Sequence, residues 1–180
     1  MRSLAPIVDK LADAQSTFFR AADVIPSEQW TAKPGEQEWS AAEVVAHLVM
    51  VELAIVGGAD RISQKKAKPI PILERAHLPI WMVKIRLLRR KSPLPLNASL
   101  VRDKEEMLGE LRAARERSLA FLEETRRRDL SGYRWRHAFL GMLNVYEWFE
   151  MIAAHQIRHA KQIKEIAERL PKAVTTAGNW

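Results

Sequence analysis

Cysteine is absent from this sequence of 180 residues. Its absence excludes disulfide scaffolds, thiolate zinc fingers, iron–sulfur sites and cysteine nucleophiles, and it agrees with a reducing compartment. A secretory signal is also missing, because Asp9 and Lys10 interrupt the short apolar run 4–8. No apolar run approaches the roughly 20 residues that span a bilayer. We therefore expect a cytoplasmic protein.

Acidic residues are scarce in one part of the chain. The whole sequence has 29 Lys and Arg against 22 Asp and Glu, but the stretch 61–102 contains eleven basic residues and a single acid, Glu74. That stretch carries a charge of +10, whereas the rest of the chain sums to −3. The pI of about 9.9 therefore describes one segment and not the surface of the whole protein.

The length and composition are those of one globular domain. Hydrophobic residues make up 47% of the chain and charged residues 28%, and 180 residues suffice for one sizeable core. We expect a single domain over 1–171, interrupted by an insertion at about 60–98, and a flexible tail over 172–180.

The spacing of apolar residues predicts four amphipathic helices, because these residues recur every three or four positions. The helices are expected at about 4–25, 40–58, 99–125 and 144–170. Pro26 follows the first helix, Gly57 and Gly58 would end the second, and Pro171 would end the fourth. There is no alternating strand pattern and no repeat. The sequence predicts an all-α fold, an antiparallel four-helix bundle with a long, basic, proline-containing insertion between helices two and three.

Two helix starts carry the signature of a capping box. The Ser40 hydroxyl can accept the backbone N–H of Glu43 while the Glu43 carboxylate accepts that of Ser40. Asn144 can cap the fourth helix, with Glu147 three residues on. The third helix has charges that stabilise its macrodipole, with acids near its N-terminus (Asp103, Glu105 and Glu106) and bases near its C-terminus (Arg126, Arg127 and Arg128).

Three of the five histidines fall on inward faces of two predicted helices. At about 100° per residue, His155 and His159 share the apolar stripe of the last helix, and His47 faces inward on the second. Each could be an ordinary core histidine that is hydrogen-bonded to a neighbour. Three imidazoles buried together, however, need a shared partner, and a divalent metal ion supplies one. Three protein ligands would leave a position for water or substrate, as in catalytic sites.

The run from His155 to His159 also resembles the HExxH helix of zinc peptidases. In that motif the glutamate is the general base, whereas Gln156 takes its place here and cannot accept a proton. At 100° from His155, Gln156 should lie toward the flank of the helix. A peptidase is therefore disfavoured. Nucleotide and nucleophile motifs such as GxGxxG, GxxxxGK(S/T) and GxSxG are absent.

Three segments together resemble the DinB-like (DinB/YfiT) superfamily: EWSAAEVVAHL (38–48), HAFLGMLNVYEW (137–148) and HQIRHAKQI (155–163). The resemblance implies a four-helix bundle that commonly dimerises and that binds a divalent metal, nickel or zinc in many members. By position, the implied metal ligands are His47, His155 and His159. Two features depart from the family: many relatives have Glu at the position of Gln156, and 61–98 is longer and more basic than the usual connection.

The resemblance also implies a class of chemistry. Members with assigned activity include transferases and isomerases that use bacillithiol, mycothiol or glutathione. A low-molecular-weight thiol that coordinates the metal would lose its proton and become a nucleophile, with no need for a protein cysteine. The expected function is thus thiol-dependent transfer, or metal-assisted hydrolysis, on a small-molecule substrate.

Other residues near these motifs have competing interpretations. Glu43 could orient His47, but the capping box explains its presence without a metal. His137 matches a family position and could shape the site entrance, although a partly exposed loop histidine is the simpler interpretation. Gln162 could hydrogen-bond a ligand imidazole or form a structural bond across the bundle. Trp148 and Met151 are expected in the core.

The basic stretch allows an alternative function. Within 78–91, Leu78, Trp81, Ile85 and Leu88 gather on one side of a helical wheel, but Ile80, Val83 and Leu87 lie opposite and the cations are scattered. We expect the apolar residues to pack on the bundle or a partner chain while the cations stay solvated. The alternative is a non-enzymatic protein that uses 61–102 to dock an anionic membrane or nucleic acid.

Overall fold

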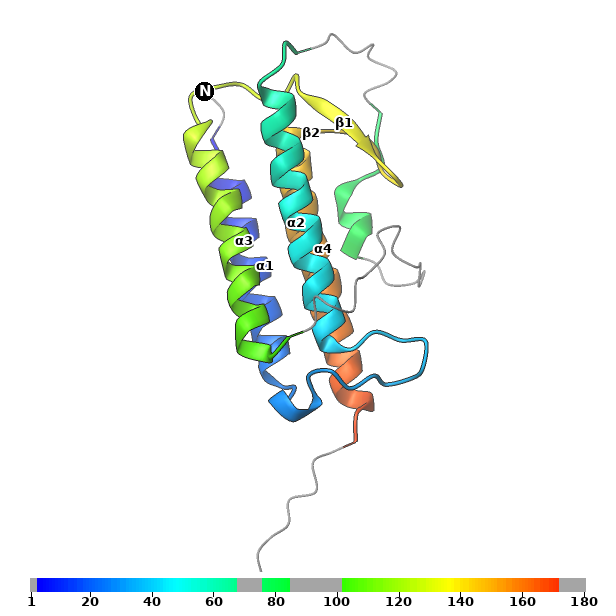
Figure 1. The fold of residues 1–180 in the computed structure, drawn as a ribbon. Coiled ribbons are helices and arrows are strands. Elements are labelled where there is room, and N and C mark those ends of the chain that lie inside the picture. Colours follow the sequence, from blue (N-terminus) through cyan, green and yellow to red (C-terminus); the bar gives the residue numbers. More distant parts are fainter. Residues whose placement is uncertain (1–2, 68–75, 85–101, 172–180) are drawn as a thin grey trace, which may run out of the picture.

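The computed structural model describes residues 3–67, 76–84 and 102–171. Most of these residues belong to four long helices, α1 (Ala5–Asp23), α2 (Ala41–Ser63), α3 (Lys104–Glu124) and α4 (Val145–Arg169). Two short 3-10 helices, η1 (Ser27–Gln29) and η3 (Ile80–Lys84), and two strands complete the described elements. The long helices lie side by side (Figure 1). The prediction of a mostly helical protein with four helices is confirmed.

The helices do not all alternate in direction. In Figure 1, α2 and α3 run the same way, and α1 and α4 run the other way. Two contacts agree with this arrangement: Arg128, after α3, donates to the Ser63 carbonyl at the end of α2, and Lys104, at the start of α3, donates to the Ile25 carbonyl after α1. The antiparallel prediction is therefore wrong for α2 and α3. The chain between these helices is long enough to return to the other end before α3 begins.

Both predicted capping boxes are present. The Glu43 N–H donates to Ser40 Oγ at 3.2 Å, and the Ser40 N–H donates to the Glu43 carboxylate at 2.8 Å. At α4 the corresponding bonds between Asn144 and Glu147 are 3.0 and 2.7 Å. These bonds satisfy backbone donors that have no partner within the helix. They fix where the two histidine-bearing helices begin.

Several predicted helix ends are wrong. The α2 helix passes through Gly57 and Gly58 and ends at Ser63, because neither glycine adopts the left-handed conformation that terminates helices. The α3 helix begins at Lys104, and its last turn has no basic residue, since the three arginines 126–128 follow it. Residues 99–101, the predicted tail 172–180 and the parts 68–75 and 85–98 of the insertion lie outside the described residues.

The structure contains an antiparallel hairpin that was not predicted. Its strands, β1 (Arg134–His137) and β2 (Gly141–Asn144), have four residues each, and Trp135 pairs with Leu143. Such short strands leave almost no alternation to detect in a sequence. Gly141 has a φ of 98° and lies against the backbone of Ala76. The hairpin leads directly into α4 and places Trp135 against that helix, where its ring stacks on Trp148 at 4.7 Å.

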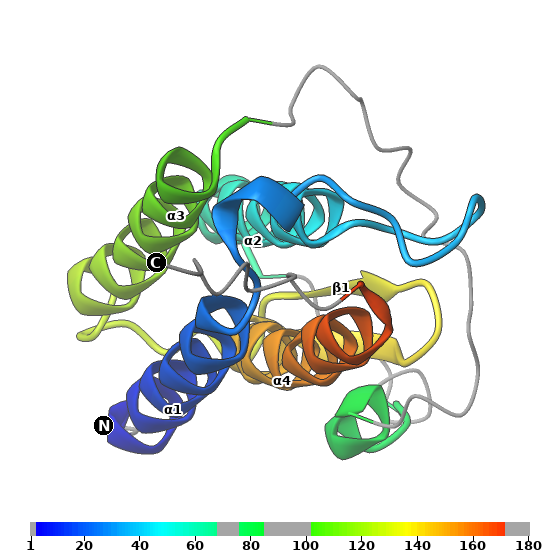
Figure 2. The same cartoon turned by 90° about the horizontal axis from the view of Figure 1, so that it is seen from below.

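The apolar core lies between the four long helices. Figure 2 views them along their length, with η3 beside α4 on the side away from α3. By length and composition α2 could cross a membrane, with a mean hydropathy of 1.7 over 18 residues, half of them buried. It thus comes closer to a membrane span than we expected from its sequence. In this fold, α2 packs against α3 and α4 and carries the buried residues His47 and Glu52.

Candidate metal centre

The structure brings the three predicted histidines together. His47 lies on α2, and His155 and His159 lie one turn apart on α4. The Nε2 atom of His155 is 3.3 Å from Nε2 of His47 and 3.0 Å from Nε2 of His159. One ring nitrogen from each histidine lies within 4.8 Å of the others. Helices that start 104 positions apart therefore bring three imidazoles to one point between them.

The spacing of these nitrogens suits a single metal ion. Two nitrogens bound tetrahedrally to one ion at about 2.0–2.1 Å lie about 3.3 Å apart. The two Nε2–Nε2 distances, 3.3 and 3.0 Å, are close to this separation. Imidazole is a favoured ligand of zinc, nickel, copper and iron. The donor set therefore fits a divalent transition metal.

Hydrogen bonding among the rings alone satisfies the cluster poorly. His159 Nδ1 lies 2.8 Å from the side-chain oxygen of Gln162, so a proton on Nδ1 completes that bond and leaves the lone pair on Nε2. His155 Nε2 contacts both other rings but can donate only one proton. Nδ1 of His47 is buried and has no hydrogen-bond partner among the described residues. A shared metal ion would satisfy all three Nε2 lone pairs at once.

Burial keeps the three rings neutral. It lowers the pKa of His47 to about 4. It also lowers the pKa of His155 to about 3, with a further contribution from charge on His47. Burial, and then charge on His155 and His47, lowers the pKa of His159 well below its usual range. Each ring therefore has a lone pair available for a metal at neutral pH.

A family comparison agrees with this site. The model described as the DinB superfamily matches residues 10–163. The chain belongs to the DinB superfamily. A further relative is "Uncharacterized protein YuaE" of Bacillus subtilis (strain 168), which is 29% identical over 150 residues, or 83% of this chain and 90% of that protein. The DinB match includes His47, His155 and His159, and members of this superfamily often bind metal.

Two side chains beside the DinB-type cluster restrain its rings. Gln162 accepts a hydrogen bond from Nδ1 of His159, so one of the two roles considered for it is confirmed. The ring of Trp39 lies 5.1 Å from that of His47 and is nearly parallel to that of His159 at 6.4 Å. Glu43 caps α2, as the capping interpretation predicts. Its carboxylate also pairs with Lys33 at 2.7 Å.

A buried polar network next to the cluster was not predicted. Arg115 of α3 donates to the Glu52 carboxylate at 2.7 and 3.1 Å, and to the side-chain oxygen of Gln156 at 2.8 Å. It also donates to the Leu11 carbonyl of α1, and Ser118 donates to Glu52 at 2.7 Å. The network joins all four long helices. The signal for it was the position of Arg115, four residues after Leu111 and seven after Leu108, which places it on the buried face of α3.

This network corrects the expected position of Gln156. Its side chain is 1% exposed and lies in the core, not at the flank of α4. The expectation that it is not a general base stands, because an amide cannot take a proton. Its bond to Arg115 assigns it to the packing of α4 against α3.

His137 lies at the end of β1, and not in a loop as expected. Its Nδ1 accepts backbone N–H bonds from Phe139 and Leu140, both at 3.1 Å, so the neutral ring carries its proton on Nε2. The ring packs 5.1 Å from Trp148, and charge on His137 would lower the pKa of His155. His137 is therefore a neighbour of the cluster. Trp148 is buried, as predicted.

Proposed function

We propose that this chain binds one divalent metal ion through the Nε2 atoms of His47, His155 and His159 and acts as an enzyme on a small molecule. The observation that carries the proposal is the convergence of three imidazole nitrogens from two helices at the spacing of ligands to one ion. His47 and His159 are buried and His155 is half-buried. The reaction would be thiol-dependent transfer or hydrolysis. We propose nickel or zinc as the metal, following the resemblance to the DinB-like proteins.

An ion held by three protein ligands would supply a Lewis acid with one open position, which lowers the pKa of a thiol or water that reaches it. The chain has no cysteine, so the thiol in the transfer reaction would be a separate low-molecular-weight molecule. Hydrolysis would need only water. The two reactions therefore differ in their dependence on an added thiol.

The surrounding side chains would prepare the ligands for this role. Gln162 holds the proton of His159 on Nδ1, which leaves Nε2 free to bind. Trp39 covers one side of His47 and His159 and limits the access of water from that side. The glutamate of the HExxH motif is replaced here by Gln156, an amide that cannot accept a proton and that is bound to Arg115.

We also propose that the protein is a cytoplasmic four-helix bundle and a homodimer. The absence of cysteine supports the compartment. The resemblance to the DinB-like proteins supports both the bundle and the dimer. Sedimentation equilibrium of the purified chain tests the assembly, because a homodimer should have twice the mass of one chain of 20.6 kDa and a monomer should have the mass of one.

Metal analysis tests the proposed site. Protein purified without nickel resin should contain close to one divalent ion per chain, and the double variant His155→Ala, His159→Ala should contain none. His77→Ala is the matched control, since His77 pairs with Glu147 and lies outside the cluster; it should keep its metal. A metal-free wild type that also fails to bind added nickel or zinc would disprove the proposal.

A further inference from the structure

Exposed apolar side chains gather in one part of the described structure. The large hydrophobic residues that are most exposed there are Val24 (65%), Leu78 (48%), Trp81 (61%), Met82 (39%) and Phe139 (48%). All but Val24 come from two neighbouring segments, 78–82 and the hairpin turn. We call Leu78, Trp81, Met82 and Phe139 the apolar patch. Single exposed apolar residues are common, but a group of four that includes two aromatic rings indicates an interaction surface.

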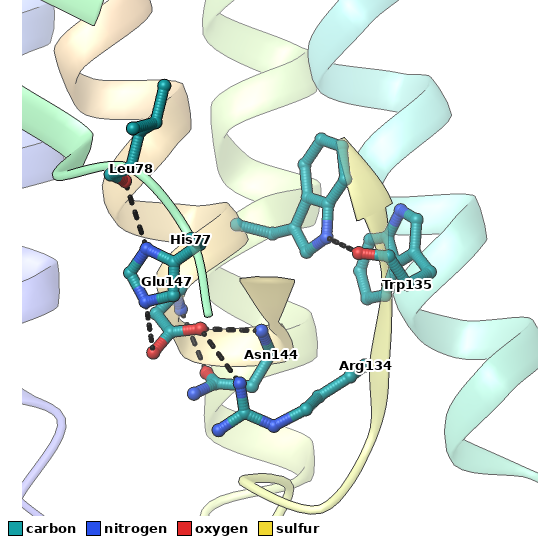
Figure 3. A network of polar contacts seen from close by, with 7 residues as sticks. His77, Leu78, Arg134, Trp135, Asn144 and Glu147 are labelled. Atoms are coloured by element: carbon teal, nitrogen blue, oxygen red, sulfur yellow. Dashed lines mark hydrogen bonds and ion pairs between the residues drawn. The ribbon is translucent and has the colours of Figure 1, made fainter. Parts of the chain in front are cut away.

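The segment that carries this patch is fixed to the rest of the fold. His77 forms a β-bridge with Gly141, and the Leu78 N–H donates to the Leu140 carbonyl at 2.7 Å. His77 Nε2 also lies 3.3 Å from the Glu147 carboxylate (Figure 3). These contacts join the segment to the hairpin and to the first turn of α4. The backbone of this segment is therefore held against the hairpin and α4.

Only one side of this segment is buried by the protein itself. Ile80 and Val83 of η3 pack against the core beside the hairpin and α4, whereas Trp81 and Met82 point outward and remain exposed. The sequence suggested that the apolar residues here would all pack on the bundle or on a partner chain. Ile80 and Val83 do pack on the helices, as this prediction states. The apolar patch is what this packing leaves uncovered.

The apolar patch lies in a basic part of the sequence. Its main segment lies in the middle of the stretch 61–102, which carries +10. Among the described residues, Lys65, Lys66 and Lys84 of this stretch are exposed, and so is Arg136 in the hairpin. Glu147 is the acid that contacts the segment, and it is already paired with His77 and Arg134. A partner with negative charge is therefore favoured.

We propose that the apolar patch docks this protein on an anionic lipid membrane. Trp81 and Phe139 would enter the interface between headgroups and acyl chains, together with Leu78 and Met82, while the lysines and arginines contact the headgroups. A second copy of the chain fits less well, because exposed cations such as Lys84 would face their counterparts on the other copy. Nucleic acid also fits less well, since its protein interfaces are polar and gain little from Leu78 and Met82.

Vesicle binding tests this proposal. The full-length protein should sediment with vesicles in which about a third of the lipid is phosphatidylglycerol, and not with phosphatidylcholine vesicles, and salt should weaken the binding. The double variant Trp81→Ser, Phe139→Ser should bind about tenfold more weakly or worse, because two aromatic side chains no longer enter the interface. Lys84→Ala should bind about fivefold more weakly, since one cation is lost.

The matched control is Val24→Ser, which also removes an exposed apolar side chain. Val24 follows α1 beside Ile25, which packs with Leu170 at the end of α4 opposite the hairpin. This variant should bind vesicles like the wild type. The variants at Trp81 and Phe139, Lys84 and Val24 should keep their metal and their circular dichroism spectrum. The variant that lacks His155 and His159 should still bind vesicles, so failure of the metal proposal is separable from failure of this one.

Several results would overturn the proposal. One is a wild type that does not bind the anionic vesicles, or that binds phosphatidylcholine equally well. Another is binding that Val24→Ser weakens as much as the patch variant does. If the protein binds no vesicles and only the patch variant disrupts a dimer, the surface belongs to a second copy. If only the patch variant disrupts a complex with duplex DNA instead, the surface belongs to nucleic acid.

Discussion

The Nε2 atoms of His47 and His155 lie 3.3 Å apart although 108 positions separate these residues in the chain. Neither atom can satisfy the other fully, because His155 Nε2 also contacts His159 at 3.0 Å and has only one proton to donate. A metal ion shared by the three rings would satisfy both atoms.

Gln162→Leu should weaken metal binding about 10- to 100-fold, because His159 loses the acceptor that holds its proton on Nδ1. Competition with a chelator of known affinity measures the change. Gln162→Glu keeps an acceptor oxygen and should bind at least as tightly as the wild type. Equal weakening in both variants would show that Gln162 acts through packing and not through this hydrogen bond.

Arg115→Leu should destabilise the metal-free protein by about 3–5 kcal/mol, since it leaves the Glu52 carboxylate buried without its partner. Urea unfolding measures the loss. The double variant Arg115→Leu, Glu52→Leu should recover most of it, because no unpaired charge remains. A double variant that is as unstable as the sum of both single variants would contradict a direct coupling between these two residues.

Acid should destabilise the metal-free protein partly through the histidine cluster. The folded pKa of His47, about 4, and that of His155, about 3, lie below the unfolded value of 6.5. The unfolded chain therefore takes up more protons than the folded chain as pH falls below 6.5. Stability should be greatest above pH 6.5 and should decline by about 1.4 kcal/mol per pH unit for each histidine down to its folded pKa.

Thermal unfolding of the metal-free protein across this pH range tests the acid prediction. His155→Leu removes one of the titrating groups while the carboxylates stay the same, so its melting temperature should fall less steeply below pH 6.5. A steeper fall in this variant than in the wild type would contradict the assignment of the low pKa to His155.

Gly141→Ala should cost about 1–3 kcal/mol, because the residue has a φ of 98° and a Cβ there would lie 2.9 Å from the Ala76 carbonyl. It should also loosen the segment 76–84, which hydrogen exchange would detect. Gly109→Ala in α3 is the control, since its Cβ would meet nothing within 4 Å. That variant should gain about 0.5–1 kcal/mol in helix stability. Equal changes in stability for Gly141→Ala and Gly109→Ala would contradict the inference that an alanine is strained at position 141.

The sequence predicted the candidate site better than it predicted the path of the chain. The site could be found because helical periodicity places His155 and His159 on one face, and because the boxes at Ser40 and Asn144 fix where α2 and α4 begin. The spacing of apolar residues shows where each helix lies in the sequence. It does not show whether two helices joined by a long connection run in the same or in opposite directions. The parallel direction of these two helices was therefore missed.

Features that depend on tertiary contacts were also missed. The hairpin has four-residue strands, and its pairing is supported by the stack of Trp135 on Trp148, which no local pattern shows. The partner of Arg115 could not be named, because Glu52 lies on another helix. The exposure of Trp81 could not be foreseen either, since the sequence does not show which side of η3 the bundle covers.

An anomalous difference map tests the central claim most directly. Crystals of protein purified without nickel resin should be measured at the absorption edge of the metal found by elemental analysis. The account predicts one peak about 2.0–2.1 Å from the Nε2 atoms of His47, His155 and His159. A metal-containing protein whose peak lies elsewhere, or crystals soaked in nickel or zinc that show no peak among these three histidines, would contradict it.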